Sequence, residues 1–194
     1  MNFFKKLFNI QTDEDTETEK QEVKLSLDDL FVHNFLKKGG KFLYCVNKAE
    51  VIDNFKKVLS ENNWDEIYLL NESLASLFNK NEVKIIHKFN DNTPILTSCE
   101  HLIADNGDIL FSSNQLKSTR LREFSDNFIV YATTSQLVKD TGQGLTGIKT
   151  NRTKSLPTNI SAIKNYIIDN SDDNFLNYGN SNSKNLYLLL LEDL

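Results

Sequence analysis

The chain of 194 residues has few of the residue types that build metal and redox centres. Its two cysteines, Cys45 and Cys99, are far apart and form no C-x-x-C pair. The chain therefore does not supply by itself the thiolate ligands of a zinc finger or an iron–sulfur cluster. His33 and His87 stand alone, so no spacing typical of a metal site occurs. We predict no metal and no other cofactor.

Several other features are absent. The sequence contains no G-x-x-x-x-G-K-[ST], no G-x-S-x-G and no H-E-x-x-H motif, which argues against P-loop, α/β-hydrolase and zinc-protease chemistry. No stretch reaches the ~20 apolar residues of a membrane span, and MNFFKKLFNI lacks the order of a signal peptide. A net charge of −5 disfavours nucleic acid as a partner. We expect a cytoplasmic protein with no transmembrane segment.

The composition divides the chain into three parts. Residues 1–10 carry apolar side chains at helical spacing and predict a short amphipathic helix, which either docks on its own domain or contacts a protein partner. Residues 11–25 are rich in acidic side chains and predict a flexible linker. Residues 26–194 are long enough to bury one sizeable core.

Residues 26–194 alternate between the apolar patterns of strands and of helices. We predict strands at residues 41–47, 66–70, 83–89, 108–113, 127–133, 159–163 and 186–193. We predict helices at residues 26–38, 51–62, 72–79, from 98 to 102, and at 134–150, where three glycines weaken the second half. Residues 169–185 are polar and predict a surface loop. This alternation is typical of parallel βαβ units, so the predicted fold is α/β, a three-layer sandwich with a mostly parallel sheet.

The stretch IADNGDILFSSNQ at residues 103–115 is the best candidate for a ligand site, because ligands of open α/β sheets bind in polar turns that follow strands. Its glycine permits a tight backbone, and its short polar side chains offer several hydrogen bonds in a row. An arginine nearby would anchor an anion with its planar fork. An Asx turn followed by a solvated loop explains the same residues without a ligand. The candidate ligand-binding residues are Asn106, Gly107, Asp108, Ser112, Ser113, Asn114 and Arg120.

The sequence SCEH at residues 98–101 raises the question of a nucleophile pair between Cys99 and His101. On a helix, residues two apart do not face each other. On a strand they would share a face, but no third group is evident that would orient the imidazole. We therefore predict no catalytic dyad here.

The residues resemble a known family. The order TSCEHLIADNGDILFSS, Arg120, NFIVYATTSQLV and KNLYLLLLED is similar to that of the LUD domain, of the lactate-utilisation protein C type, over residues 26–194. Residues 103–108 match the family's I-A-E-T-G-T with Asp in place of Glu. Arg120 is the counterpart of the family's arginine, and Phe128 stands where the family has histidine. The acidic residue of the family's G-P-S-x-T-A-D-I-E motif has no counterpart in residues 155–161.

The resemblance implies a fold like that of the NagB/RpiA/CoA-transferase superfamily. It also implies an accessory or small-carboxylate-binding component related to the oxidation of L-lactate to pyruvate, beside separate subunits that carry iron–sulfur clusters. The predicted ligand is a lactate-like carboxylate held by Arg120 and the turn before it.

Two alternatives remain open, and with them the question whether the chain is an enzyme. Asp105-Asn106-Gly107 is similar to the S-E-N-G motif of some CoA transferases, which would make Asp105 the nucleophile of an acyl transfer. Asp is one methylene shorter than Glu, and a misplacement of about 1.5 Å costs on the order of 10²-fold in rate. The missing motif residues favour instead a non-catalytic interaction module.

Overall fold

The computed structural model describes residues 25–78, 83–86, 90, 92–151, 155–167 and 182–193. The helix predicted at residues 1–10 lies outside the described residues, as do residues 11–24 of the predicted linker and most of the loop predicted at 169–185.

Six parallel strands form the larger sheet, in the order β1-β10-β7-β4-β2-β3. The two central strands, β10 (Asn185–Leu191) and β7 (Asn127–Thr133), are buried along most of their length. Such continuous apolar runs belong to parallel strands that are covered on both faces. The α/β class with a mostly parallel sheet is thereby confirmed. The other strands are β1 (Lys41–Cys45), β2 (Glu66–Leu69), β3 (Lys84–Ile86) and β4 (Ile95–Ser98).

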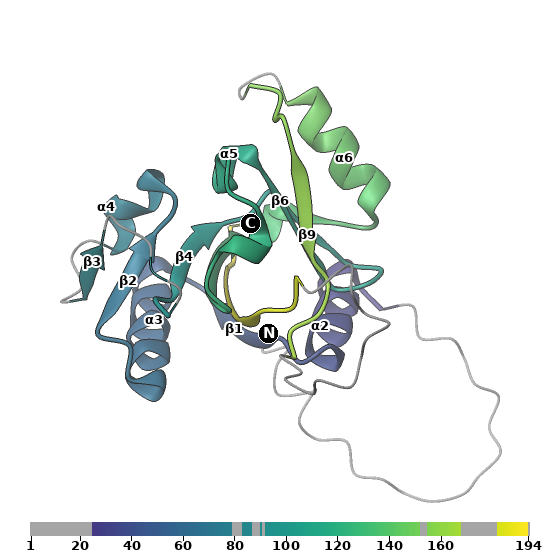
Figure 1. Ribbon diagram of the computed structural model, residues 1–194. Helices are drawn as coiled ribbons and strands as arrows, with labels where there is room; N and C mark the ends of the chain where they lie inside the picture. Colours follow the sequence, from purple (N-terminus) through teal and green to yellow (C-terminus); the bar gives the residue numbers. More distant parts are fainter. Residues whose placement is uncertain are drawn as a thin grey trace, which may run out of the picture.

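Helices cover one face of this sheet (Figure 1). Helix α3 (Lys48–Asn62) begins at Asn47, whose side chain accepts a hydrogen bond from the Glu50 amide at 3.0 Å, and ends at Asn63 in the left-handed conformation. Its apolar stripe, which the sequence predicted, packs Val51 and Phe55 against the sheet. The short 3-10 helix η1 (Glu72–Leu74) and helix α4 (Ala75–Phe78) lie on the same side.

A second sheet and helix α2 (Leu27–Lys37) cover the other face. This sheet has four strands in the order β8-β5-β6-β9, and β6 pairs antiparallel with both of its neighbours. The sequence did not predict a second sheet, because fully buried antiparallel strands have the same apolar pattern as parallel ones. Its strands are β5 (His101–Ile103), β6 (Asp108–Ser112), β8 (Leu137–Val138) and β9 (Ile160–Ile163).

Two sequence predictions for single elements are wrong. Strand β4 was not predicted, because its residues were expected to enter a short helix up to Leu102; that helix is in fact strand β5, which follows β4 after two residues. Residues 134–150 begin with the 3-10 helix η3 (Thr134–Gln136) and β8, and the helix, α6 (Thr141–Thr150), occupies the glycine-containing second half. A Cβ at Gly144 would lie 3.2 Å from Ile103 Cδ1, so the glycine allows close packing of α6 on the second sheet and offsets the weaker helix propensity.

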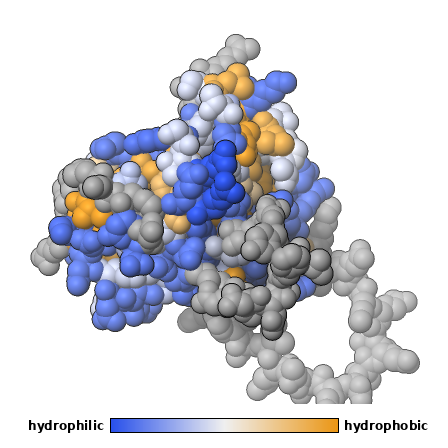
Figure 2. Space-filling view, viewed as in Figure 1, coloured by the Kyte–Doolittle hydropathy of each residue, from blue (hydrophilic) through white to orange (hydrophobic). Residues whose placement is uncertain are grey.

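Apolar side chains reach the surface in more than one place on the face shown in Figure 2. Figure 2 shows apolar side chains gathered over α6 and β9, the elements that carry the exposed Leu145 and Ile160. Across the part of the chain that the structure describes, no helix combines the length and apolarity needed to cross a bilayer.

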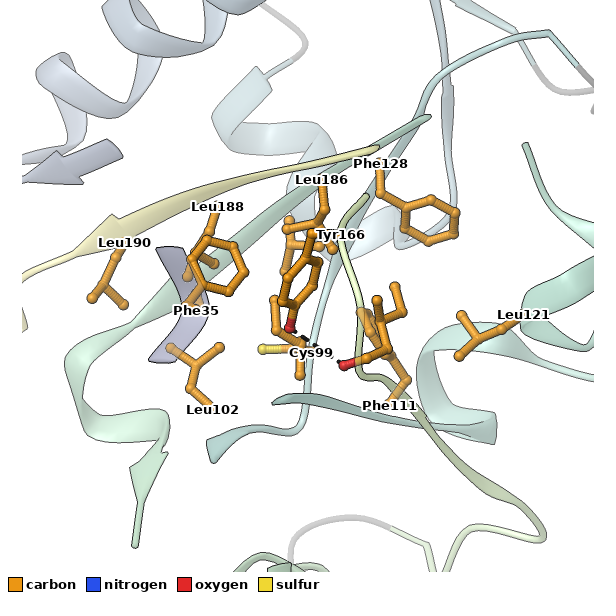
Figure 3. Packing of buried hydrophobic residues seen from close by; sticks show 14 of the residues in the cluster. Phe35, Cys99, Leu102, Phe111, Leu121, Phe128, Tyr166, Leu186, Leu188 and Leu190 are labelled. Atoms are coloured by element: carbon orange, nitrogen blue, oxygen red, sulfur yellow. Dashed lines mark hydrogen bonds between the residues drawn. The ribbon is translucent and has the colours of Figure 1, made fainter. Parts of the chain in front are cut away.

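Tyr166 connects the end of β9 to the turn between β5 and β6. Its ring lies among the buried apolar side chains between the two sheets (Figure 3), and its hydroxyl donates a hydrogen bond to the Gly107 carbonyl at 2.6 Å. Burial, with a smaller contribution from the charge of Asp108, raises the pKa of Tyr166 well above its ordinary value of about 10. The folded protein therefore keeps this phenol protonated where the unfolded chain ionises it.

Replacing Tyr166 by phenylalanine is expected to lower the free energy of unfolding by about 1–2 kcal/mol at neutral pH, because the buried Gly107 carbonyl loses its donor. The wild-type stability should be unaffected by this group below pH 10 and should fall above it, by up to about 1.4 kcal/mol per pH unit. The Tyr166→Phe variant should lack this fall in stability above pH 10. Urea unfolding at pH 9 and pH 11 measures both effects. If the free energy of unfolding falls as steeply with pH in the variant as in the wild type, the raised pKa of Tyr166 is contradicted.

Candidate functional site

Polar residues follow two neighbouring strands of the larger sheet at the point where each strand ends. Glu100 follows β4, and Ser135 and Gln136 follow β7 in η3. Strands β4 and β7 are parallel and paired, so both ends lie at the same edge of the sheet. Ligands of α/β sheets bind beyond the carboxyl ends of strands, which makes this edge the first place to examine.

Glu100 is a buried carboxylate at this edge, only 8% exposed. Its Oε1 accepts hydrogen bonds from Ser112 Oγ at 2.6 Å, Gln115 Nε2 at 2.9 Å and Asn114 Nδ2 at 3.2 Å. Ser112 also caps helix α5 (Ser113–Leu116), and Gln115 Oε1 accepts from the Ser112 amide at 2.8 Å. Hydrogen bonds from several donors offset the cost of burying this charge.

His101 lies next to Glu100 at the start of β5. Its Nδ1 is 3.3 Å from the Gln136 carbonyl oxygen. A carbonyl oxygen only accepts, so Nδ1 carries the hydrogen and Nε2 of the neutral ring carries a lone pair. A Cβ at Gly147 of α6 would lie 2.9 Å from that Nε2. The glycine therefore leaves the space that the imidazole needs.

These groups line a cavity of about 250 Å³. This is less than the roughly 300–1,000 Å³ of sites for drug-sized molecules and suits a metabolite of a few heavy atoms. Among the described residues that line it there is no lysine or arginine, and no three His, Cys, Asp or Glu side chains of the described part gather as metal ligands. Its main polar lining residues are Glu100, His101, Asn114, Ser135, Gln136 and Asn151.

The structure brings some of the predicted ligand-binding residues to this cavity and leaves others elsewhere. Asn114 lines it, while Ser112 lies behind Glu100 and is fully buried. The Ser113 hydroxyl accepts a hydrogen bond from the Thr158 amide at 2.9 Å. Arg120 is exposed and is not part of the cavity wall. An anion site at Arg120 therefore stays a prediction.

The turn between β5 and β6 lies at the other end of the hairpin from the cavity. Strand β6 runs from Asp108 to Ser112, and at roughly 3.4 Å per residue this separates the two by about 14 Å. Asn106 Oδ1 accepts from the Asp108 amide at 3.1 Å, as in an Asx turn, and Asp108 pairs with Lys38 at 2.7 Å. Asp105 is exposed on this turn. The expected convergence of the turn and Ser112 on one cavity is thus wrong, because the hairpin holds them apart.

Gly142, Gly144 and Gly147 have the spacing of a G-x-G-x-x-G dinucleotide-binding motif. In that motif the glycines form a turn in front of a helix whose free amides bind phosphate. Here they lie inside α6, and Asp140 caps the helix by accepting a hydrogen bond from the Gln143 amide at 2.9 Å. The arrangement serves helix packing rather than phosphate binding.

Comparison with known families gives a match that spans most of the described domain. The model of the LUD domain family matches residues 29–191. The chain belongs to the LUD domain family. This confirms the membership expected from the sequence. The search of curated proteins gave no match to this LUD domain.

The LUD domain is also similar to a solved structure. The crystal structure of a DUF162 family protein from Deinococcus radiodurans superposes with a TM-score of 0.61, over 87% of this chain and 99% of that one. The two sequences are 13% identical, so the likeness concerns the fold.

Phe128, which the resemblance in the sequence places at the position of a histidine, is fully buried at the start of β7. The Lys184 ammonium lies 5.7 Å from the centre of its ring. The cavity lies beyond the other end of the strand, so the replacement leaves the cavity lining unchanged.

Sequence reasoning passed over Glu100 and set His101 aside. The SCEH stretch drew attention to Cys99, but the Cys99 sulfur lies in the core between the sheets (Figure 3), and the residue is 2% exposed. The usable signal was an adjacent acid and histidine directly after a buried strand. Their partners Gln136 and Asn114 come from distant parts of the chain, which no spacing rule joins.

Proposed function

We propose that this LUD-domain protein binds a small 2-hydroxycarboxylate of the lactate type in the cavity at Glu100 and His101, as an accessory component related to L-lactate utilisation. The observation that carries the proposal is the pairing, in one small cavity, of a buried carboxylate with an imidazole lone pair. Both groups accept hydrogen bonds, and the hydroxyl of a hydroxy acid donates one.

The charge of Glu100 decides the orientation of such a ligand. Like charges repel in a partly buried site, so the carboxylate of the ligand should lie away from Glu100, at the mouth. Asn114 lies on that path: its Nδ2 gives one hydrogen to Glu100, and the second amide hydrogen is available to a ligand. Asn151, an exposed residue at the end of α6, also lines the cavity. The hydroxyl of the ligand then points inward to His101.

Replacing His101 by phenylalanine is expected to weaken the binding of L-lactate about tenfold, since one hydrogen bond to a partly buried group is lost while the ring shape is kept. Arg120→Ala should leave the affinity unchanged, because Arg120 lies outside the cavity wall. Isothermal calorimetry with L-lactate measures both variants. The opposite pattern, a loss with Arg120→Ala alone, would place the anion site at the loop around Arg120 and overturn the proposal.

A second pair of variants tests the same cavity without changing its hydrogen-bonding groups. Gly147→Ala places a Cβ 2.9 Å from His101 Nε2, whereas Gly142→Ala meets only the Asp140 carboxylate at 3.1 Å. Both changes raise helix propensity by about 1 kcal/mol. Only Gly147→Ala should weaken lactate binding, and equal affinities of the two variants would count against His101 as a contact.

A further inference from the structure

The hydroxyl of Ser135, at the cavity wall, has its hydrogen directed away from the cavity. Ser135 Oγ donates to Asp193 Oδ2 at 2.6 Å, and a carboxylate only accepts. Thr133 Oγ1 lies 2.9 Å from the same Ser135 Oγ, and Ser135 cannot be the donor in that pair because its hydrogen is donated to Asp193. A hydroxyl oxygen has two acceptor positions, so Ser135 keeps one of them for a ligand and has no hydrogen to offer.

Gln136 has no amide hydrogen for the cavity either. Its Nε2 donates to the Cys99 carbonyl at 2.7 Å and to the Glu100 carbonyl at 3.2 Å, and its Oε1 accepts from the Thr133 amide at 2.8 Å. Its backbone carbonyl holds the hydrogen of His101 Nδ1, at 3.3 Å. This part of the cavity wall thus presents acceptors: the oxygen of the exposed Ser135, the His101 Nε2 lone pair and the Glu100 carboxylate.

We propose that Asp193 and Gln136 are specificity-determining positioning residues. Acting through Ser135 and His101, they make this part of the cavity wall an acceptor surface, which selects a hydroxyl over a carbonyl at the same ligand position. The inference rests on the proposed function and adds its selectivity. A hydroxyl gives its hydrogen to this wall, while a carbonyl oxygen would face other acceptors with no hydrogen between them.

The charge of Asp193 keeps the Ser135 hydroxyl in this orientation. Partial desolvation acts to raise the pKa of Asp193, but hydrogen bonds from Ser135 and Thr134 outweigh it and lower the pKa to about 2. The carboxylate is therefore ionised throughout the physiological range. Its Oδ1 accepts from Thr134 Oγ1 at 2.7 Å and from the Ser135 amide at 2.9 Å, which fixes the rotamer.

The matched ligands L-lactate and pyruvate, which differ at the second carbon by hydroxyl and carbonyl, test the inference by calorimetry on the full chain. The wild-type protein should bind L-lactate at least about tenfold more tightly than pyruvate. In Asp193→Asn, the new amide would donate to Ser135 Oγ and turn the serine hydrogen towards the cavity. The lactate-to-pyruvate affinity ratio should then fall about threefold to tenfold.

Glu192→Gln removes the same charge one residue away and serves as the control, because the Glu192 side chain is hydrogen-bonded with Tyr44. The lactate-to-pyruvate affinity ratio of Glu192→Gln should equal that of the wild type. Equal binding of both ligands by the wild type overturns the inference and leaves the proposed function standing, whereas binding of neither overturns the proposed function. If the lactate-to-pyruvate affinity ratio is unchanged in Asp193→Asn, Asp193 is not a positioning residue. The same conclusion follows if Glu192→Gln lowers the ratio equally.

Discussion

Replacing Gly107 by alanine is expected to lower the free energy of unfolding by about 2–5 kcal/mol. Gly107 has φ of 69°, where an L side chain costs about 1–2 kcal/mol. A Cβ there would also lie 2.5 Å from Phe35 N and 2.7 Å from the Asn34 carbonyl carbon. These are backbone atoms of α2, so the whole helix would have to move.

The surrounding contacts explain why α2 cannot move freely. Asn34 Nδ2 donates to the Ala104 carbonyl at 2.9 Å and to the Asp105 carbonyl at 3.1 Å, which fastens the helix to the same turn. Phe35 is fully buried and packs on Tyr166 with ring centres 4.5 Å apart. A shift of α2 would break these contacts together.

Gly39→Ala is the matched control for Gly107→Ala. Gly39 also has a positive φ, of 86°, but its Cβ would meet the side chain of Ile167 at 2.5 Å. Ile167 is 56% exposed, so its side chain can rotate away and the cost should stay near 1–2 kcal/mol. Chemical denaturation of both variants measures the difference. Equal losses would show that the approach of α2 contributes nothing beyond backbone strain.

The second large effect is expected from Glu100→Ala, which should destabilise the protein by about 3–5 kcal/mol. Each hydrogen bond to a charged group contributes about 1.5–3 kcal/mol. Ser112 is 0% exposed and Gln115 is 3% exposed, so water cannot replace the carboxylate as their acceptor. The truncation leaves the Gln115 amide buried without its acceptor, and Ser112 Oγ keeps only its longer hydrogen bond to Gln115 Oε1 at 3.2 Å.

Glu100→Gln keeps an oxygen for the three donors and removes only the charge. Its loss of stability should be about 1–2 kcal/mol, because neutral hydrogen bonds are roughly half as strong as charge-assisted ones. Urea denaturation with circular dichroism separates the two variants. If Glu100→Ala has the same midpoint of urea denaturation as the wild type, the hydrogen bonds around Glu100 do not stabilise the domain.

Much of the fold could be predicted from the sequence, for physical reasons that can be named. The run from Leu186 to Leu191 has no polar position, which predicts a strand buried on both faces, and the stripe from Val51 to Leu59 predicts α3. Family membership rested on residues in chain order, and the match to residues 29–191 confirms it.

The candidate site was harder to predict, because its members come together only through strand pairing in the two sheets. Asn106 and Ser112 are close in the chain, but an extended strand carries them to opposite ends of a hairpin. Gln136 and Glu100 are far apart in the chain, yet β4 and β7 run side by side and end at one edge. Local periodicity contains no information on such pairings.

The linear order of residues therefore established the α/β class, the family and the buried strands, since each depends on patterns within a short window or on residues in chain order. The role of each polar residue was decided by three-dimensional contacts. Gly107 faces a helix backbone and Glu100 receives three donors because hydrogen-bonded strands and packed layers bring together groups from distant segments, and burial then determines which of them water can reach.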